Sequence, residues 1–548
     1  MVNYFNGINL GYKALTAQKT SLDVIGHNIS NANTEGYSRQ RAVHNASNPY
    51  PIPGLNTPAG PGQMGTGVEI EKIERIKSEF IEQQIRGESQ KQGFWNKLSE
   101  GLRRIETILN EPSETSLNNA LESFWESLQD LGNNPEDVAI RETVKESAIT
   151  LTDTFFTLYK QLDDYQSSLN RDVSATVDKV NSLSSRIADL NRQIVSIRGS
   201  GMEPNDLLDK RDLLFGELSQ LVDVQGKVDS RGNLNVSVGG MVLVAGTDVF
   251  ELAVEPSEVP KEYKDTVVFA RTGEEVLIQG GELAGIIETR DEAINHYKAR
   301  LNKLSAGLAE GFNEFHREGY DLNGDPGEDF FIIDENYDNQ AQGLRVSEEI
   351  RTNPDKIAAG NYSDNPTVVM AENVSALVDD YYTISVSVGT GTEDFDYTVS
   401  DIDGNLITSG SANALEEVDL TSAIGINIYL RSTGEANISF LGNPGSGDNA
   451  TFLADFLKNG EAINGISVTS YFEATVSNIG VEGQRAEHMT DNQRVVLEQL
   501  ENQREAYSGV SLDEEMANMI KFHQAYNAAA RIITTTDTLL DTLINMTR

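Results

Sequence analysis

A very long run of apolar residues, spaced alternately three and four apart, restricts the fold of this chain more than any other feature. The run starts at Val144 and continues to Leu169. After one extra step of four it resumes at Val173 and ends near Ile197. Such spacing places the apolar side chains on one face of an α-helix, and the extra step is a stutter that locally unwinds a coiled coil. A helix over 144–197 is about 80 Å long. We therefore predict a helical rod rather than the packing unit of a compact enzyme.

The two ends of the chain repeat this spacing over shorter lengths. At the N-terminal end the apolar positions are Phe5, Ile8, Tyr12, Leu15, Leu22 and Ile29, with Lys19 and Gly26 in the two slots that break the spacing. At the C-terminal end they are Leu512, Met516, Met519, Tyr526, Ala530, Ile533, Leu540 and Ile544, with His523 and Asp537 as exceptions. A single helix with so narrow an apolar stripe is marginally stable in water. Each end therefore needs a partner. The N-terminal end is mainly basic and the C-terminal end mainly acidic, so we expect the two ends to pair as coiled-coil helices.

Other parts of the chain show an apolar period of two. Leu234, Val236 and Val238 alternate before the dipeptide Gly239-Gly240, so β-hairpins are predicted over 222–287. A second stretch, from about 346 to 468, also alternates and contains turn dipeptides, so it is expected to be mostly β. Helix is expected to return near residue 484.

These patterns together predict an α+β multidomain protein whose chain folds back on itself. Residues 1–45 and 505–548 are expected to form a terminal coiled-coil assembly domain. Residues 46–340 and 472–504 are expected to form a helical and mixed domain, with the long helix 144–197 and the hairpins 222–287. Residues 341–471 are expected to form an inserted, β-rich outer domain.

Composition excludes several classes of function. The chain has 548 residues, a formal net charge of −42 and no cysteine. Binding of nucleic acid needs clustered Lys and Arg, so it is not expected. Thiol catalysis, disulfides and cysteine metal sites are excluded. No membrane span is predicted because no apolar run approaches about 18 residues, and the N-terminal segment lacks the pattern of a cleaved signal peptide. Composition alone predicts a cytosolic protein.

The sequence contains no convincing catalytic, cofactor or metal site. Its histidines do not occur at metal-ligand spacing with one another or with carboxylates. Asp321, Asn323 and Asp325 imitate the start of an EF-hand loop, but Pro326 and Ile332 stand where that loop needs Gly and Glu, so a polar turn is expected. The glycine pattern at 60–65 follows a proline-rich run rather than a strand, which argues against nucleotide binding. We predict no catalytic residue, no cofactor and no metal.

Two segments at opposite ends resemble the paired signatures of bacterial flagellar axial proteins, the class of rod, hook and hook-associated proteins. The first is LTAQKTSLDVIGHNISNANTEGYSRQRA, residues 15–42, and the second is SGVSLDEEMANMIKFHQAYNAAARIITTTDTLLDTLI, residues 508–544. Matching positions in the first include Leu22, Asn28, Ile29, Asn31, Asn33, Thr34, Gly36, Tyr37 and Arg39. The presence of both signatures identifies the chain as a member of this class.

Interior segments narrow the resemblance to the hook-associated protein 1 family, the first junction proteins between hook and filament. These segments are GTGVEIEKIERIKSEFIEQQIR, NDLLDKRDLLFGELSQLVDV, GGELAGIIETRDE and GYDLNGDPGEDFF, which begin at residues 65, 205, 280 and 319. The resemblance covers about residues 1–340 and 475–548. It does not extend to the predicted β-rich domain.

The resemblance implies a non-enzymatic structural protein that joins hook to filament. It implies a ring of subunits on the hook tip, in contact with hook protein on one side and with a filament-side hook-associated protein on the other. It also implies a flagellar export chaperone that holds the C-terminal stripe in the cytoplasm, and export as an unfolded chain through the type III apparatus. The expected location is therefore the extracellular hook–filament junction, which replaces the cytosolic prediction from composition.

We expect the assembly interface to combine the two apolar stripes with the loop that follows the first helix. The loop positions are Asn28, Asn31, Asn33, Gly36, Tyr37 and Arg39. The asparagines are expected to end the helix and bond backbone groups, so that the chain leaves at a fixed angle. Arg39 and Arg41 are expected to meet acidic neighbours. Assembly is expected to proceed by coupled folding and binding.

Two alternatives remain open within this reading, namely a flagellar hook protein and an extended coiled-coil surface adhesin. The helix 144–197, followed by the segment NDLLDKRDLL, argues against hook protein. An adhesin would bind its target as a free monomer. An enzyme such as a wall hydrolase built into the flagellum would need a pair of carboxylates in a cleft.

Overall fold

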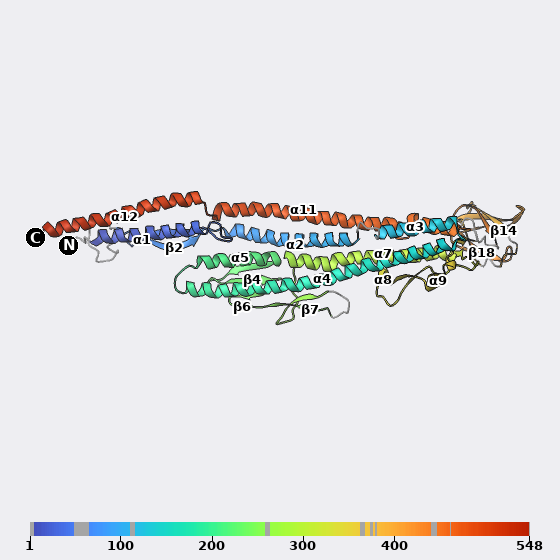
Figure 1. Ribbon diagram of the computed structural model, residues 1–548, viewed down its shortest axis with the longest axis horizontal. Helices are drawn as coiled ribbons and strands as arrows, with labels where there is room; N and C mark the ends of the chain where they lie inside the picture. Colours follow the sequence, from blue (N-terminus) through green and yellow to red (C-terminus); the bar gives the residue numbers. More distant parts are fainter. Residues whose placement is uncertain are drawn as a thin grey trace. The chain divides into compact units, whose positions relative to one another are not determined.

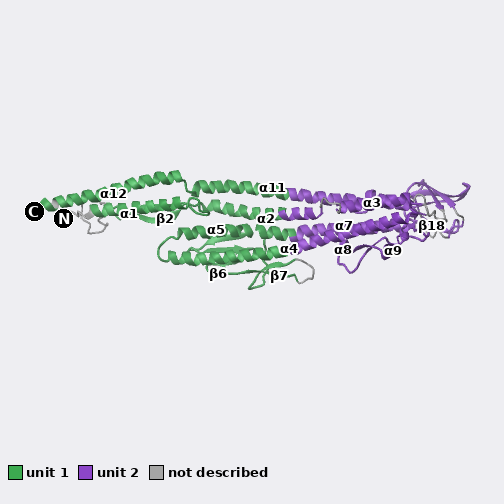
Figure 2. Ribbon diagram, viewed as in Figure 1, with its two compact units in different colours: residues 1–99, 169–289, 485–548 green, residues 100–168, 290–484 purple. Residues whose placement is uncertain are grey.

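The chain, described here by a computed structural model, divides into two compact units, each assembled from segments far apart in sequence (Figure 2). Unit 1 contains residues 1–99, 169–289 and 485–548, and unit 2 contains residues 100–168 and 290–484. The fold mixes α and β structure, as predicted, whereas the three-domain division remains a proposal. The structure describes residues 5–48, 65–109, 116–257, 264–361, 368–372, 376–378, 381–439, 446–460 and 462–546.

The long helix predicted from the apolar spacing is part of α4, Val138–Arg198, which contributes to both units (Figures 1 and 2). Its predicted apolar stripe is buried both before and after the stutter. Stripe residues with no exposed surface are Val144, Ala148, Leu151, Phe155, Leu162, Val173, Val180, Ile187 and Ile194. This helix is therefore confirmed, and it extends six residues beyond its predicted start.

In unit 1 the two ends of the chain lie side by side as antiparallel helices (Figure 1). α1 (Phe5–Ser30) packs along α12 (Leu512–Met546), and the sheet of β1 (Gln40–Ala46) and β2 (Val68–Arg75) packs against α1. The predicted pairing of the terminal helices is confirmed, while a supercoiled geometry remains a proposal. The other helical parts of unit 1 come from α2 (Glu79–Leu109), α4, α5 (Asn205–Leu221), α6 (Gly281–Glu288) and α11 (Val468–Ser508).

The predicted hairpins form a four-stranded antiparallel meander and a separate strand pair in unit 1. At the predicted turn Val238 pairs with Met241, while Gly239 and Gly240 have φ values of +56° and +80°. Such left-handed backbone is what a two-residue hairpin turn requires. The strands are β3 (Val224–Val228), β4 (Leu234–Val238), β5 (Met241–Ala245), β6 (Asp248–Val249), β7 (Leu252–Glu255) and β8 (Thr266–Phe269).

The predicted extension of β structure to residue 287 is wrong, because Gly281–Glu288 is helix α6. Leu283, Ala284 and Ile286 are buried there, and a short apolar run cannot by itself distinguish a strand from a buried helix. Gly281 has φ +82°, and a Cβ at this position would lie 2.5 Å from the Leu221 carbonyl carbon. The close backbone contact at the start of α6 therefore requires glycine.

The helical part of unit 2 surrounds a group of aromatic side chains. Neighbouring rings of Phe124, Phe312, Phe330 and Phe331 have centroids 4.8–5.8 Å apart. A π-helical turn, Thr289–Ala293, leads into α7. The elements around this core are α3 (Leu117–Asn133), α7 (Ile294–Glu318), α8 (Gln340–Gly343), α9 (Glu348–Thr352), α10 (Asp448–Asn459), the 3-10 helix Pro354–Lys356, β9 (Gly319–Tyr320), β10 (Phe331–Ile333), β11 (Leu344–Val346) and β12 (Gly360–Asn361).

The β-rich part of unit 2 consists of two antiparallel sheets whose buried residues form one core. The strand order is β16-β15-β14-β19 in one sheet and β13-β18-β17 in the other. The strands are β13 (Val369–Glu372), β14 (Tyr381–Val388), β15 (Phe395–Asp401), β16 (Leu406–Ala412), β17 (Glu417–Leu420), β18 (Ile426–Leu430) and β19 (Gly434–Ser439).

Two predictions about the borders of this β-rich part are wrong. The predicted β stretch 346–468 also contains helices α9 and α10, and α11 starts at Val468 rather than near residue 484. In α10 the buried residues Ala450, Leu453, Ala454 and Leu457 show helical spacing, which was missed between the strand patterns.

Unit 2 contains a histidine whose protonation should change its stability. His316 has no exposed surface, and its Nδ1 lies 2.5 Å from the carbonyl oxygen of Glu328 while Nε2 accepts a hydrogen bond from Ala358 N at 2.9 Å. Burial lowers the pKa of His316 from 6.5 to about 4. Between these values the unfolded chain binds a proton that the folded chain does not, so stability is lost as pH falls through this window.

We expect the cost of His316→Gln, measured as a difference in unfolding free energy, to be about 2–3 kcal/mol smaller at about pH 4.5 than at about pH 7. Trp125 fluorescence in a Trp95→Phe background reports unit 2. Burial raises the pKa of Glu318 to about 7, so its contribution to stability falls as pH rises, opposite to that of His316. Glu318 is present in both proteins, so its contribution cancels in the difference. An equal cost at the two pH values would contradict the prediction.

Candidate assembly site

The two terminal helices of unit 1 approach closely along small residues. A Cβ at Gly7 would lie 2.9 Å from Thr536 Oγ1, and one at Gly11 would lie 2.6 Å from Ile533 Cγ1. Further along the same face of α1, Asn28 is bonded to Glu515 of α12. On α1 the contact face therefore passes through Gly7, Gly11 and Asn28.

This contact face lies one residue away from the apolar stripe predicted to pair the ends. The predicted residues Ile8, Leu15, Leu22 and Ile29 are only half-buried. On α12, Met516 and Met519 are 58% and 36% exposed, while Tyr526, Ile533 and Leu540 are half-buried. On α1 the pairing therefore relies on glycine contacts and a buried polar pair more than on the predicted stripe, whereas on α12 the predicted stripe residue Ile533 packs against Gly11. Sequence spacing alone could not separate the adjacent faces of α1.

Asn28 is the centre of the polar contacts at the end of α1. Its side chain is 1% exposed. Its Oδ1 accepts hydrogen bonds from Gln40 N at 3.0 Å and from the Tyr37 hydroxyl at 2.8 Å. Its Nδ2 donates to Gln40 O at 2.9 Å and to Glu515 Oε2 at 3.0 Å. All four hydrogen-bonding positions of the amide are thus used, as burial of a polar group requires.

Arg39 completes the contact between the loop and the start of α12. Its Nε donates to Glu515 Oε1 at 2.7 Å, and its Nη1 donates to Glu514 Oε2 at 2.7 Å. Its backbone N donates to Ser508 O at 3.0 Å. Burial by itself lowers the pKa of Arg39, but the two glutamates outweigh this, so its pKa is raised. Glu515, 2% exposed, therefore has both a cation and an amide donor.

The same loop is bound on its other side by α5, within the NDLLDKRDLL segment. Ser38 N donates to Asp209 Oδ2 at 3.1 Å, and Gln40 Nε2 donates to Asp206 Oδ1 at 2.9 Å. Asn205 Nδ2 donates to Gln40 Oε1 at 3.1 Å. The N-terminal signature, the C-terminal signature and the interior segment therefore meet at one site.

A cluster of charges fixes α5 to the strand β2. Arg75 Nη1 donates to Asp209 Oδ1 at 2.8 Å and to Asp212 Oδ2 at 2.9 Å, and Lys77 Nζ donates to Asp212 Oδ2 at 2.6 Å. Burial raises the pKa of Asp209 despite Arg75. Burial also acts to raise the pKa of Asp212, but Lys77 and Arg75 outweigh it and the pKa is lowered.

Tyr37 lies between Asn28 at the end of α1 and the carboxylates of α5. Its hydroxyl, which donates to Asn28, also lies 3.0 Å from His27 Nδ1. Burial raises the pKa of Tyr37, and nearby carboxylates, first Asp206, raise it further. The phenol is therefore a neutral hydrogen-bonding group across the physiological range.

The structure confirms part of the predicted role of the loop residues. Asn28 and Asn31 bond backbone groups, with Asn31 Nδ2 donating to His27 O at 3.0 Å, whereas Asn33 is exposed. Gly36 has φ +74° and turns the chain toward α5. As expected, Arg39 and Arg41 meet acids, the latter through Glu74 Oε1 at 2.6 Å.

Several residues of the site were missed from the sequence. Glu515 lies within the C-terminal signature and the acids of α5 lie within an interior family segment, but no partner was predicted for either of them. The repeated opposite charges of IERIK and NDLLDKRD, residues 73–77 and 205–212, are the signal that could have paired these segments. A contact of β1 with α12 was also missed. There the rings of His44 and Phe522 are stacked with centroids 5.8 Å apart.

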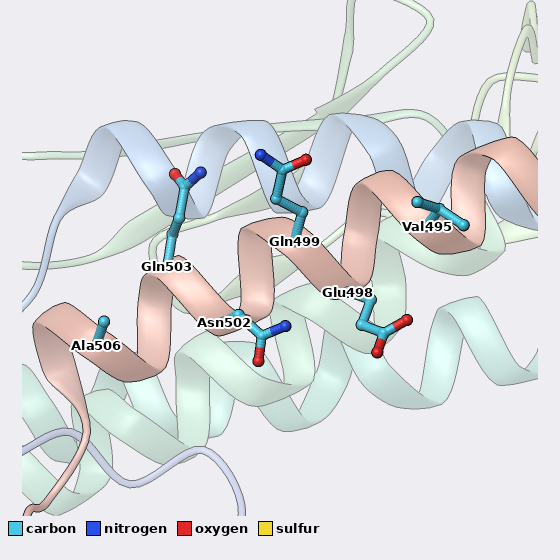
Figure 3. A pocket seen from close by; sticks show the side chains of 6 residues that line it. All are labelled: Val495, Glu498, Gln499, Asn502, Gln503 and Ala506. Carbon is cyan, nitrogen blue, oxygen red and sulfur yellow. The ribbon is translucent and has the colours of Figure 1, made fainter.

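A shallow groove follows one face of α11 in unit 1 (Figure 3). It is lined by Val495, Glu498, Gln499, Asn502, Gln503 and Ala506, with a cavity volume of about 500 Å³. The groove supplies a single carboxylate, whereas glycoside hydrolysis ordinarily uses two. This particular groove is therefore not the two-carboxylate cleft that a hydrolase needs.

The EF-hand-like loop is a polar turn, as predicted. Asp321 Oδ1 accepts hydrogen bonds from Asn323 N and Asp325 N, and Lys356 Nζ lies 2.9 Å from Asp321 Oδ2. The described residues contain no group of three or more His, Cys, Asp or Glu able to hold a metal. No helix among them is long and apolar enough to cross a membrane. Gly60 and Gly62 of the glycine pattern lie outside the described residues.

Comparison with known families assigns both ends to one class. Residues 8–37 match the family described as "Flagella basal body rod protein", and residues 502–546 match "Flagellar basal body rod FlgEFG protein C-terminal". These two segments form the antiparallel helix pair and its loop. The terminal site therefore defines a protein of the flagellar axial class.

Comparisons over the whole length identify the family within this class. Residues 102–331 match "Flagellar hook-associated protein FlgK helical domain". Flagellar hook-associated protein 1 of Bacillus subtilis (strain 168) is 31% identical over 100% of this chain and 99% of the relative. The corresponding protein of Escherichia coli (strain K12) is 30% identical over 98% and 99%. The chain belongs to the flagellar hook-associated protein 1 family.

A solved structure supports the fold. The flagellar hook junction protein FlgK from Burkholderia pseudomallei aligns with a TM-score of 0.58 and 20% identity, covering 78% of this chain and 100% of that chain. At this identity the likeness concerns the fold alone.

Proposed function

We propose that this chain is the structural, non-enzymatic protein that joins hook to filament in the bacterial flagellum. The observation that carries the proposal is the Asn28 site, where both terminal signatures and the interior segment of the hook-associated protein 1 family bind one another. In a ring of identical subunits, the chain of every subunit must leave its terminal helices in the same direction. A fully hydrogen-bonded loop held from both sides supports that role.

Self-assembly would use the apolar residues that the helix pair leaves accessible. Met516 and Met519 are exposed, and Ile8, Leu15, Leu22 and Ile29 are half-buried. Burying such side chains against a second subunit stabilises a contact by roughly 25 cal/mol per Å² of apolar surface. The proposed ring therefore rests on these stripes, supplemented by Tyr526, Ile533 and Leu540.

Membership of the family supports a proposal for the remaining partners. They are hook protein on one side of the ring, a filament-side hook-associated protein on the other, and an export chaperone and the type III export apparatus before assembly. The proposed final location is extracellular, at the hook–filament junction, after a transient cytoplasmic stage. An exposed apolar stripe on α12 gives the chaperone a physical reason to act, because such a surface promotes aggregation until it is covered.

We expect Leu22→Asp to abolish incorporation into junctions while unit 2 remains folded. A carboxylate on a half-buried stripe position would remove apolar burial and add a desolvation cost of several kcal/mol in the ring. Hook-basal bodies isolated from a deletion strain that produces each variant would be probed by immunoblot, with Leu22→Met as the matched control. Recovery of Leu22→Asp at the control level would contradict the proposed interface.

A further inference from the structure

One edge strand in the β-rich part of unit 2 lacks the charged residues that the other edge strands contain. Among the described strands, β16, β19, β13 and β17 are the edges of the two sheets. Unpaired strand edges invite further strands, and proteins commonly block them with charged residues or proline. The sequence of β13 contains Glu372, β17 contains Glu417 and Asp419, and β19 contains Glu435.

The strand β16 has neither charge nor proline, and its one irregularity is a bulge at Ile407 in its pairing with β15. Its sequence, LITSGSA, contains no charged residue and no proline over seven residues. It pairs with β15 alone in the described sheet, so its other edge presents backbone groups. Leu406 is 63% exposed and Ile407 is 38% exposed, and Ser409 and Ser411 are also exposed. The edge is therefore accessible and partly apolar.

Negative charge surrounds this neutral strand. From residue 357 to residue 430 the sequence contains no Lys, Arg or His. Asp401 and Asp403 lie in the turn before β16, and Asp396 pairs with Ser411 near its other end. None of the carboxylate residues between β14 and β18 is buried: Glu393, Asp394, Asp396, Asp401, Asp403, Glu416, Glu417 and Asp419.

We propose that β16 is a docking edge for an extended, basic segment of a partner protein, which adds a strand to the sheet. Backbone hydrogen bonds along the free edge would supply affinity, and the surrounding carboxylates would select positive charge. A second copy of this chain is disfavoured because its β16 would bring the same carboxylates against these. This inference is independent of the proposed junction role and concerns a different part of the molecule.

The full-length protein would be titrated into a fluorescein-labelled, eight-residue peptide of alternating Val and Lys, with anisotropy as the measurement. Three variants at exposed positions are compared, namely Ser409→Lys and Ser409→Glu on β16, and Ser422→Lys in the turn before β18 as the charge-matched control. Circular dichroism checks that each variant is folded.

We expect Ser409→Lys to weaken binding at least tenfold, Ser422→Lys less than threefold, and Ser409→Glu not at all. A peptide of alternating Val and Glu, and a basic peptide with Pro at its centre, should bind at least tenfold more weakly than the Val–Lys peptide. Equal losses for the two Lys variants, or undiminished binding of the Pro peptide, would mean general charge attraction and overturn the proposal. Concentration-dependent self-association abolished by Ser409→Lys would identify a second copy instead and also overturn it.

Discussion

Asn28→Asp is expected to separate the two ends of the chain. The new oxygen would face Gln40 O and Glu515 Oε2, two acceptors that now receive hydrogen bonds from Asn28 Nδ2 at 2.9 and 3.0 Å. A buried carboxylate next to a second carboxylate, with lost donors, costs about 3–5 kcal/mol. Amides of residues 510–522 should therefore exchange with deuterium at least a hundredfold faster, as measured by mass spectrometry.

The pH dependence of this defect has a definite sign. In the variant, the carboxylate introduced at position 28 would be buried beside the carboxylate of Glu515 and the carbonyl oxygen of Gln40, so the folded pKa of this new group rises above its unfolded value. The stability of the variant is therefore highest at low pH and is lost as pH rises. We expect a smaller exchange defect at about pH 5 than at about pH 8, after correction for intrinsic exchange rates.

The control for Asn28→Asp is the same substitution at Asn33. Asn33 lies in the same loop but is exposed, so Asn33→Asp should change stability by less than about 0.5 kcal/mol. Adding Glu515→Gln to Asn28→Asp should restore part of the protection, because the Gln amide can donate to the new carboxylate. Equal effects at residues 28 and 33, or no response to Glu515→Gln, would contradict the assigned contact.

Gly11→Ala is expected to weaken the pairing of α1 and α12, although alanine is the better helix former. The added Cβ would lie 2.6 Å from Ile533 Cγ1 and 3.4 Å from Ala529 O, so α12 would have to shift. Overpacking of this kind costs about 1–3 kcal/mol, which exceeds the gain of up to about 1 kcal/mol in helix propensity. Gly11→Leu should cause a larger loss.

The same helix provides the matched control for Gly11. A Cβ at Gly26 would have no neighbouring atom within 4 Å, so Gly26→Ala should stabilise α1 by up to about 1 kcal/mol. Thermal unfolding of unit 1, followed by Trp95 fluorescence in a Trp125→Phe background, would compare the two. A stabilising Gly11→Ala would show that the helices do not approach at this point.

The long-range features of the fold could be predicted where one physical signal dominates. The α4 stripe repeats so many times that its burial follows from spacing, and Gly239-Gly240 between alternating strands specifies a hairpin. The prediction that β structure extends to residue 287 was wrong because the short apolar run in α6 fits both the period of two of a strand and the period of 3.6 of a helix. Helix α10 was missed since its spacing extends over only three steps.

The candidate site was predicted only in part, because some of its contacts carry no local signal in the sequence. Asn28 and Arg39 were identified from the signature, and Arg39 meets acids as expected. Which helix face pairs the ends was not predictable, because Gly7 and Gly11 provide no hydrophobic signal and act only through close backbone approach. The part played by Asp206 and Asp209 depends on tertiary contacts between segments about 170 residues apart, which no local period encodes.

The central claim, that this chain joins hook to filament, is tested most directly by deleting its gene and examining cells and medium by electron microscopy and immunoblot. Expression of the wild-type chain from a plasmid is the control. We predict hooks without filaments and flagellin released into the medium as monomer, with filaments restored by the plasmid. Normal filaments on the deletion strain would contradict the account.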